Sequence, residues 1–153
     1  MTEQEILQKL IDKFPYLKEK GRVARVRRIF CDVPNENFRE VLDFVMKDLG
    51  FSILTTMTGT DDGETFGFMY HLATFSGMVF NLKISAPKTN PEIVTVTDLF
   101  PSAEMYEREV MDLLGAKVSG LKHGRRYPLH ENWPADEHPL RKDWVYKKDT
   151  GKY

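Results

Sequence analysis

Three β-type runs between residues 51 and 86 constrain the fold of this chain most strongly, because each follows the last after only a few residues. All three are rich in the β-branched and aromatic residues that strands favour. The runs are FSILTTMT (51–58), ETFGFMYHLA (64–73) and MVFNLKISA (78–86). Connections this short join antiparallel neighbours, so the sequence predicts a three-stranded antiparallel meander.

A fourth strand and three helices are predicted around this meander. RVARVRRIFCDV (22–33) is expected to be one strand that ends at Pro34. Apolar residues at helical spacing, together with capping residues, indicate the helices. They are expected over residues 3–14 after the capping box Thr2-x-x-Glu5, from the N-cap Asn35 to the C′ residue Gly50, and from about 103 to 114 after Ser102. The fold class is therefore α+β: a mainly antiparallel sheet of about four strands with three helices, plus an extended irregular C-terminal tail.

The charge of the chain changes sign near residue 116. Residues 1–116 carry 13 Lys and Arg against 18 Asp and Glu, whereas residues 117–153 carry 9 against 5. Prolines interrupt the second part and no periodicity is visible in it. We therefore expect an α+β domain (1–116) and a basic, Pro-containing C-terminal arm (117–153). Such an arm suits nucleic acid, an anionic surface or an acidic protein, and charge alone does not choose among them.

Composition argues against secretion and against membrane insertion by the chain itself. No apolar run approaches the roughly 20 residues that span a bilayer, and MTEQEILQKL lacks the features of a signal peptide. The single cysteine, Cys31, cannot form an internal disulfide, which suits a reducing cytoplasm. We expect Cys31 to be a small buried hydrophobe on its strand.

No catalytic or metal-binding pattern stands out. His123, His130 and His138 lack the spacing of zinc ligands, and His71 is expected to be a hydrogen-bonded residue of the sheet. The glycines of GTDDGETFG precede a strand rather than opening a helix, which indicates hairpin turns and not a phosphate-binding loop. We therefore expect no cofactor and no metal in this chain.

The aromatic run FGFMY (66–70) leaves an RNA-binding alternative open. Phe66, Phe68 and Tyr70 alternate as the base-stacking residues of an RNA-recognition sheet do, but Glu64-Thr65 replaces the expected basic residue and glycine. The favoured interpretation is an inward aromatic face packed under the helices. The alternative is a single-stranded RNA-binding α+β module that uses these rings and the basic arm.

Two charged clusters need an explanation. One consists of Arg22, Arg25, Arg27 and Arg28, which form either a solvated strand face or a contact for an anion or a partner. The other lies in YEREVMDLLG (106–115). On a helical wheel Ala103, Tyr106, Val110, Leu113 and Leu114 share one face, Glu107 and Glu109 flank it, and Glu104, Arg108 and Asp112 form a ladder on the opposite face. A small enzyme with Glu107 or Glu109 as general base is a third alternative, although no partner residue stands at a recognisable spacing.

Two motifs in this half of the chain resemble the 30 kDa, or C-type, subunit family of respiratory complex I and its relatives in membrane-bound [NiFe] hydrogenases. The first is the helix end E-R-E-x-x-D-φ-φ-G, matched by Glu107, Arg108, Glu109, Asp112 and Gly115. The second is P-L-R-K-D-aromatic, matched by Pro139, Leu140, Arg141, Lys142, Asp143 and Trp144. The lead-in VTVTDLFPSA (94–103) is similar to the family's strand-to-helix approach, so the resemblance covers about 90–145 most strongly.

The resemblance implies a non-catalytic structural subunit in the peripheral arm of a membrane-associated, ion-translocating oxidoreductase of the energy-converting hydrogenase or NADH:quinone oxidoreductase type. It implies that the chain holds the large hydrogenase-like (D-type) catalytic subunit and lies beside a small iron–sulfur subunit on the cytoplasmic side of the membrane. The membrane arm would be an indirect partner, and no nucleic acid is expected. Iron–sulfur clusters, and a NiFe centre in the hydrogenase case, would belong to the partner subunits.

The residues expected to contact a partner subunit come from both motifs and from the arm between them. Tryptophan and arginine are included because they dominate interface energetics. With both motifs in view, the ladder on the helix is interpreted either as a docking surface or as an anchor for the tail. The expected interface residues are Glu104, Glu107, Arg108, Glu109, Asp112, Arg125, Arg126, Trp133, Pro139, Leu140, Arg141, Lys142, Asp143 and Trp144.

Overall fold

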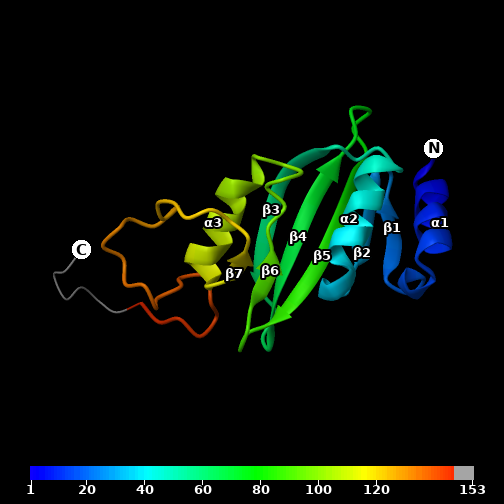
Figure 1. Ribbon diagram of the computed structural model, residues 1–153. Coiled ribbons are helices and arrows are strands. Elements are labelled where there is room, and N and C mark those ends of the chain that lie inside the picture. The colour runs from blue at the N-terminus through cyan, green and yellow to red at the C-terminus, as the bar shows by residue number, and fades with distance from the viewer. Residues whose placement is uncertain (147–153) are drawn as a thin grey trace. The chain divides into compact units, whose positions relative to one another are not determined.

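The computed structural model describes residues 1–146 and has the predicted α+β architecture (Figure 1). Its helices are α1 (Glu3–Lys13), α2 (Phe38–Lys47) and α3 (Ala103–Leu114), with short 3-10 turns at Pro15–Leu17 and Asn35–Asn37. Its strands are β1 (Gly21–Arg25), β2 (Arg28–Asp32), β3 (Ile53–Asp61), β4 (Thr65–Ala73), β5 (Val79–Pro87), β6 (Glu92–Val94) and β7 (Lys117–Ser119). No helix among residues 1–146 is both long and apolar enough to cross a bilayer.

The strands form a five-stranded sheet in the order β1-β2-β5-β4-β3 and a two-stranded sheet of β6 and β7. Within the larger sheet β5, β4 and β3 are neighbours joined by short turns, as the meander predicted. By contact density the chain divides into two compact units. Unit 1 comprises Met1–Thr58 and Phe68–Ser85, and unit 2 comprises Gly59–Gly67 and the described chain from Ala86 onward. The expected division at residue 116 stays a prediction.

The prediction of one strand over 22–33 is wrong, because this segment is a tight hairpin. β1 and β2 pair antiparallel, from Gly21 opposite Cys31 to Arg25 opposite Arg28. Arg27 stands in the turn with φ 60°, a left-handed conformation usually marked in sequence by glycine or asparagine. Because an arginine occupies this position, no turn signal interrupts the run of β-type residues.

The sheet is mixed rather than purely antiparallel. β2 pairs parallel with β5, in the register Ile29 opposite Phe80 and Cys31 opposite Leu82. A parallel pair needs a long connection, and α2, β3 and β4 all lie between these two strands in sequence. The sheet therefore has five strands instead of about four, with one parallel pair inside it.

The helix ends agree with the predicted caps only in part. Ser102 stands at the N-cap of α3 but its side chain makes no capping hydrogen bond, and the C-cap of α2 is Asp48, so Gly50 is not its C′ residue. Thr2 and Glu5 form the capping box, since each donates a backbone N–H to the other's side chain. α3 spans the predicted residues and ends at Gly115, which has φ 75°. α2, however, begins at Phe38 after a 3-10 turn that includes Asn35, so Asn35 is not its N-cap.

The core of unit 1 is aromatic and aliphatic. Phe38 of α2 packs on Tyr70 of β4 with ring centroids 4.6 Å apart, and Leu10, Val41 and Phe80 are fully buried. Burial of this kind supplies most of the driving force for folding.

The aromatic run on β4 is inaccessible to a ligand. Phe66, Phe68 and Tyr70 are all fully buried, as the inward aromatic face predicted. Because these rings cannot stack on nucleic-acid bases, the observation that motivated the RNA-binding alternative does not hold.

Two polar residues of unit 1 have the roles that the sequence predicted. His71 Nδ1 lies 2.6 Å from Asn81 Oδ1 and its Nε2 lies 2.9 Å from Thr58 Oγ1. Asn81 in turn donates to the carbonyl of Ile29 at 2.9 Å. Cys31 is a buried free thiol, and burial raises its pKa to about 12. His71 is thus a hydrogen-bonded sheet residue and Cys31 an unreactive one.

Unit 2 contains the charged helix and the arm. β6 and β7 pair parallel on either side of α3 in sequence, a pairing that the sequence did not predict. Residues 120–146 carry no helix or strand, as predicted for the tail. The last residues of the predicted arm, 147–153, lie outside the described part of the chain.

Candidate functional site

Helix α3 is the element on which unit 2 is built. Ala103, Val110 and Leu114 are buried as the helical wheel predicted, whereas Tyr106 and Leu113 of the same predicted face are half-buried. Gly59 of β3 permits this packing, since a Cβ on Gly59 would lie 2.6 Å from Leu114 Cδ1 and 2.9 Å from Val110 Cγ1. A larger side chain at residue 59 would therefore separate the helix from the strand.

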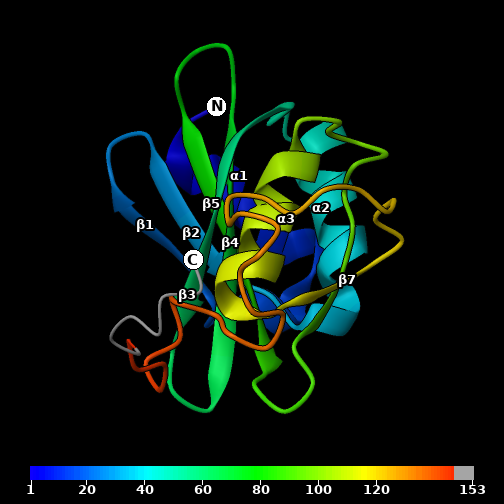
Figure 2. The same ribbon diagram turned by 90° about the vertical axis from the view of Figure 1, so that its left-hand side faces the viewer.

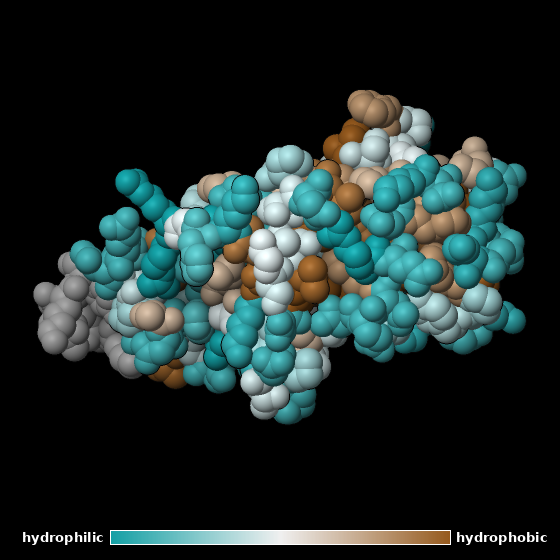
Figure 3. Space-filling model, in the orientation of Figure 1, coloured by the Kyte–Doolittle hydropathy of each residue, from teal (hydrophilic) through white to brown (hydrophobic). Residues whose placement is uncertain are grey.

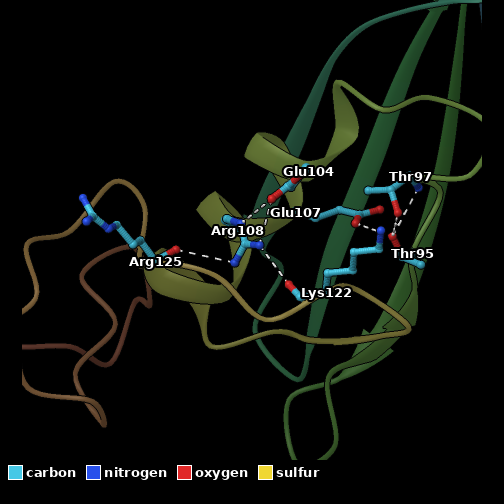
Figure 4. Close-up of polar contacts among 7 residues, drawn as sticks. All are labelled: Thr95, Thr97, Glu104, Glu107, Arg108, Lys122 and Arg125. Carbon is cyan, nitrogen blue, oxygen red and sulfur yellow. Dashed lines mark hydrogen bonds and ion pairs between the residues drawn. The ribbon is translucent and has the colours of Figure 1, made fainter.

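Glu107, which flanks the apolar face on the helical wheel, is fully buried. Its Oε2 accepts a hydrogen bond from Thr95 Oγ1 at 2.6 Å (Figure 4). Its Oε1 accepts one from the Val96 backbone N–H at 2.7 Å. Thr95 Oγ1 itself accepts from the backbone N–H of Thr97 at 3.2 Å. The carboxylate therefore ties the middle of α3 to the segment that precedes the helix, and hydrogen bonding compensates its burial.

Arg108 connects the helix to the first part of the arm. Its guanidinium pairs with Glu104 at 2.9 Å and donates to the carbonyls of Lys122 at 2.8 Å and Arg125 at 3.5 Å (Figure 4). A Cβ on Gly124 would clash with this guanidinium, so the arm passes directly over it. Only 11% of the Arg108 side chain is exposed. The predicted ladder is therefore covered by the chain's own arm at this point.

Asp112 makes the next connection and is buried too. Its Oδ1 accepts from Arg126 Nε at 3.0 Å, and its Oδ2 accepts from the Leu129 backbone N–H at 3.2 Å. Arg126 also donates to the carbonyl of Trp133. One carboxylate thus fixes two points of the arm, and charge-assisted hydrogen bonds of this kind are the stronger ones.

The second motif and the histidine that precedes it provide hydrogen-bond partners for the end of α3. The Asp112 carbonyl lies 2.8 Å from His138 Nδ1, the Leu113 carbonyl accepts from the Leu140 N–H at 3.0 Å, and the Leu114 carbonyl accepts from Arg141 Nε at 2.7 Å. The last carbonyls of a helix have no partner inside it. Here the arm supplies three of those partners, so the second motif is in direct contact with the end of the first.

Gly115 is required at this junction for two reasons. It adopts a left-handed φ of 75°, and a Cβ on it would lie 2.6 Å from His138 Nε2. That Cβ would also clash with the Arg141 guanidinium, which lies 5.3 Å from the centre of the Phe66 ring. The glycine of the first motif therefore makes room for the arginine of the second.

Asp61 and Lys88 are site residues that the sequence did not reveal. Asp61 Oδ2 accepts from the Lys142 backbone N–H at 2.8 Å and pairs with Lys88 Nζ at 2.8 Å. Lys88 also lies 3.7 Å from Asp143. The hydrogen bond from Lys88 is the main reason that the pKa of Asp61 lies below its usual range, and the same bond raises the pKa of Lys88. No local pattern could have found this pairing, because Asp61 and Lys142 are 81 residues apart.

The end of the arm gathers aromatic rings. Trp133 and Trp144 lie with ring centroids 6.1 Å apart, and Tyr146 continues the row at 6.2 Å from Trp144. Both indole N–H groups donate to Glu137, one to its carbonyl at 2.8 Å and one to its carboxylate at 3.2 Å. Leu140, Val145 and Tyr146 are exposed. An apolar surface with fixed aromatic residues has the composition of an interface core.

The structure brings together most of the residues expected at a partner interface, although whether they contact a partner stays a prediction. Glu107 and Asp112 are buried within the chain. Five of the expected residues are exposed: Glu104, Arg125, Leu140, Lys142 and Asp143. The other seven are half-buried: Arg108, Glu109, Arg126, Trp133, Pro139, Arg141 and Trp144. No cluster of metal-ligating side chains occurs among residues 1–146.

Comparison with known proteins identifies relatives over most of the chain. It is 30% identical to the C subunit of the F(420)H(2) dehydrogenase of Methanosarcina mazei, over 94% of this chain and 92% of that protein. It is 30% identical to the C subunit of the NADH-quinone oxidoreductase of Moorella thermoacetica, over 78% of this chain and 81% of that protein. It is 28% identical to the beta subunit of the membrane-bound hydrogenase of Pyrococcus furiosus, over 76% of this chain and 69% of that protein.

Two solved structures share the fold. A chain of the membrane-bound sulfane sulfur reductase, an archaeal respiratory membrane complex, superposes with a TM-score of 0.81 at 27% identity, over 98% of both chains. A trypsin-resistant fragment of Nqo5 superposes with a TM-score of 0.69 at 26% identity, over 81% of this chain and all of the fragment. The sequence also matches the family described as respiratory-chain NADH dehydrogenase, 30 Kd subunit, over residues 31–150. The chain therefore belongs to this 30 kDa subunit family, as the two motifs of its C-terminal half predicted.

Proposed function

We propose that the chain is a non-catalytic structural subunit in the peripheral arm of a membrane-associated, ion-translocating oxidoreductase, where it holds the large catalytic subunit. The observation that carries this proposal is the variety among its relatives. They belong to an NADH-quinone oxidoreductase, a membrane-bound hydrogenase, an F(420)H(2) dehydrogenase and a sulfane sulfur reductase. Because these complexes differ in the substances they oxidise or reduce, a subunit that all of them share is suited to a shared structural task.

The geometry of α3 supports a structural task. Of the two acids considered as a general base, Glu107 is engaged inside the chain by Thr95 and Val96, whereas Glu109 is half-buried. Asp112 is likewise bound to Arg126 and Leu129. A general base must reach the proton it removes, and a fully buried carboxylate does not reach a substrate in solvent. These charges act on the arm instead.

The outer face of the arm is the surface that we assign to the large subunit. Leu140, Val145 and Tyr146 are exposed on the arm, which also carries Trp133 and Trp144, whose indole N–H groups are held by Glu137. Rigid aromatic side chains lose little entropy when they are covered and are frequent at interface hot spots. In this proposal the complex is of the energy-converting hydrogenase or NADH:quinone oxidoreductase type and faces the cytoplasm. Its iron–sulfur clusters, and a NiFe centre in the hydrogenase type, lie in the large subunit and the small iron–sulfur subunit.

Affinity purification from the native cells tests this function. A tagged chain should recover the large hydrogenase-like subunit and the small iron–sulfur subunit in equal amounts. Leu140→Asp should reduce that recovery by roughly tenfold or more, since it places a charge in an apolar contact. Lys117→Gln, at an exposed position of β7, serves as the matched surface control. Recovery of the wild-type chain as a lone monomer would contradict the proposal.

A further inference from the structure

Two turns of unit 1 lie side by side although they are far apart in sequence. The β1–β2 turn at Val26 and Arg27 meets the β4–β5 turn at residues 74–78, because β2 and β5 pair parallel with Arg28 opposite Val79. The Val79 N–H donates to the Arg27 carbonyl at 3.0 Å. Figure 2 shows the blue and green turns at the same end of the sheet. We call the surface formed by residues 25–28 and 75–77 the turn patch.

The turn patch exposes apolar side chains that nothing in unit 1 covers. Phe75 is 91% exposed and Val26 is 80% exposed, the two highest values among the large hydrophobic residues of the described chain. Figure 3 shows hydrophobic atoms projecting at the upper edge, where Figure 1 places the β4–β5 turn. Between the turns is a hollow of about 460 Å³ lined by Arg25, Val26, Arg27, Arg28 and Gly77. A single exposed apolar residue is ordinary, but here an exposed valine lines a hollow and an exposed aromatic ring lies on the neighbouring turn. Exposed apolar residues that gather in one patch mark interaction sites.

The charges of the turn patch are mostly positive. Among residues 1–146, no ion pair joins Arg25 or Arg28 to a carboxylate, whereas Arg108 and Arg126 of unit 2 are both paired. One acid, Glu3, is close by. It accepts the Arg27 backbone N–H at 2.6 Å, a bond that lowers the pKa of Glu3. The Glu3 carboxylate therefore holds the turn through this hydrogen bond. It offsets only one of the three positive charges that Arg25, Arg27 and Arg28 bring to the patch.

Resting on the proposed function, we propose that the turn patch docks a second subunit of the same complex through a hydrophobic pocket with an acidic rim. Phe75 and Val26 enter the pocket, and Arg25, Arg27 and Arg28 pair with the carboxylates around it. Guanidinium groups bind carboxylates through two parallel hydrogen bonds, and arginine and aromatic residues are enriched at protein interfaces. The turn patch consists of residues from unit 1 alone, whereas the arm surface assigned to the large subunit consists of residues from unit 2.

Site-specific photo-cross-linking in the native complex tests the identity of the occupant. A photoreactive phenylalanine derivative replaces Phe75 in the full chain, and the adduct is mapped by mass spectrometry. We expect one cross-linked peptide from another subunit of the complex, with Asp or Glu flanking apolar residues. An adduct with lipid alone, or no adduct in an intact complex, would overturn the proposal.

Affinity measurements give the second readout. Phe75→Ser and the double variant Arg25→Gln with Arg28→Gln should each lower retention of the chain in the complex by about tenfold. In the arginine variant, retention should also depend less on the salt concentration. Arg22→Gln is the matched control, because Arg22 belongs to the same hairpin but its guanidinium lies over the Phe30 ring at 4.8 Å. Unaltered retention in both variants would overturn this inference while leaving the proposed function intact. Failure of the wild-type chain to recover any subunit would instead contradict both.

Vesicle sedimentation distinguishes a membrane from a protein partner. The purified chain is mixed with vesicles of phosphatidylcholine and phosphatidylserine at equal amounts. We expect no more binding than for the Phe75→Ser variant. Strong wild-type binding that is lost in Phe75→Ser would assign the patch to a lipid surface and overturn the proposal of a protein pocket.

Discussion

The charged residues of α3 and the arginines of the β1–β2 turn resemble each other in sequence, since both lie at the edge of an apolar pattern. In the structure Glu107, Arg108 and Asp112 are engaged by their own chain. Arg25 and Arg28, in contrast, have no carboxylate partner among residues 1–146. Charge density therefore does not identify an interface. In our proposal the absence of a partner within the chain is the better indicator, and the following experiments test it.

The largest effect is expected from Glu107→Ala. It removes the acceptor of the Val96 N–H, which is fully buried, and one partner of the half-buried Thr95 hydroxyl. We expect the free energy of unfolding to fall by about 3 kcal/mol, measured by urea denaturation. The matched variant Glu104→Ala removes an exposed acid from the same helix and should cost less than ~1 kcal/mol. Equal losses in the two variants would show that Glu107 is an ordinary surface charge.

Gly115→Ala should have the next largest effect. The new Cβ meets His138 and Arg141 in addition to the cost of a positive φ, and we expect a loss of about 2 kcal/mol. Gly50→Ala is the control, since Gly50 has a similar φ of 81° but a Cβ added there would have no neighbour within 4 Å. It should show only the conformational cost of roughly 1 kcal/mol. The difference between the two midpoints of thermal unfolding measures the contact between the motifs, and no difference would argue against that contact.

The ion pair of Asp61 should make the attachment of the arm depend on pH. Lys88 lowers the pKa of Asp61 in the folded protein. The contribution of Asp61 to stability is therefore fully present above its ordinary pKa of 3.8, and it is lost as the pH falls through the lower pKa of the folded protein. Lys88, with a raised pKa, contributes below 10.5 and loses its contribution as the pH rises through the higher value. The Asp61→Asn variant should therefore be less stable than the wild-type protein at neutral pH. In strong acid the two proteins should differ little in stability. Limited proteolysis of the arm across this range provides the measurement. A pH-independent difference would exclude the ion pair as its cause.

The smallest effect is expected from Arg25→Gln combined with Arg28→Gln. Neither guanidinium is paired with a carboxylate among residues 1–146, so the free energy of unfolding should change by less than about 0.5 kcal/mol. Urea denaturation of the isolated chain is again the test. A loss comparable to that of Glu107→Ala would place these arginines with the internal charges of α3 and remove the basis of the comparison.

The sequence was sufficient to predict those parts of the fold that depend on residues close together in the chain. The meander, α3 and its terminal Gly115, the capping box of α1 and the burial of Phe68 all follow from periodicity and capping residues. The β1–β2 turn was missed because Arg27 occupies a position that glycine normally marks. The parallel pairing of β2 with β5 was missed because strand order depends on packing of the whole sheet, which no window of sequence contains.

The sequence named many of the residues that lie where α3 meets the arm, but not the contacts among them; their contact with a partner stays a prediction. The two motifs identified the family and named Arg108, Asp112 and Arg141, yet they left open whether the charges face a partner or hold the tail. Helical spacing placed Glu107 at the edge of the apolar face, because a wheel cannot show that Thr95 and Val96 offer donors to a buried carboxylate. No sequence pattern indicates the role of Asp61, since its partners Lys88 and Lys142 lie in distant segments of the chain.

Hydrogen–deuterium exchange on the full chain, free of any partner, tests most directly whether the charges of α3 hold the arm. The Leu129 N–H donates to the Asp112 side chain and the Leu140 N–H to the Leu113 carbonyl, while the Lys142 N–H donates to Asp61. We expect these three amides to exchange slowly in the isolated chain and Leu129 to lose its protection in Asp112→Ala. Exchange at the rate of an unstructured peptide in the isolated chain, with protection only after a partner subunit binds, would contradict this account. The ladder on α3 would then be a docking surface after all.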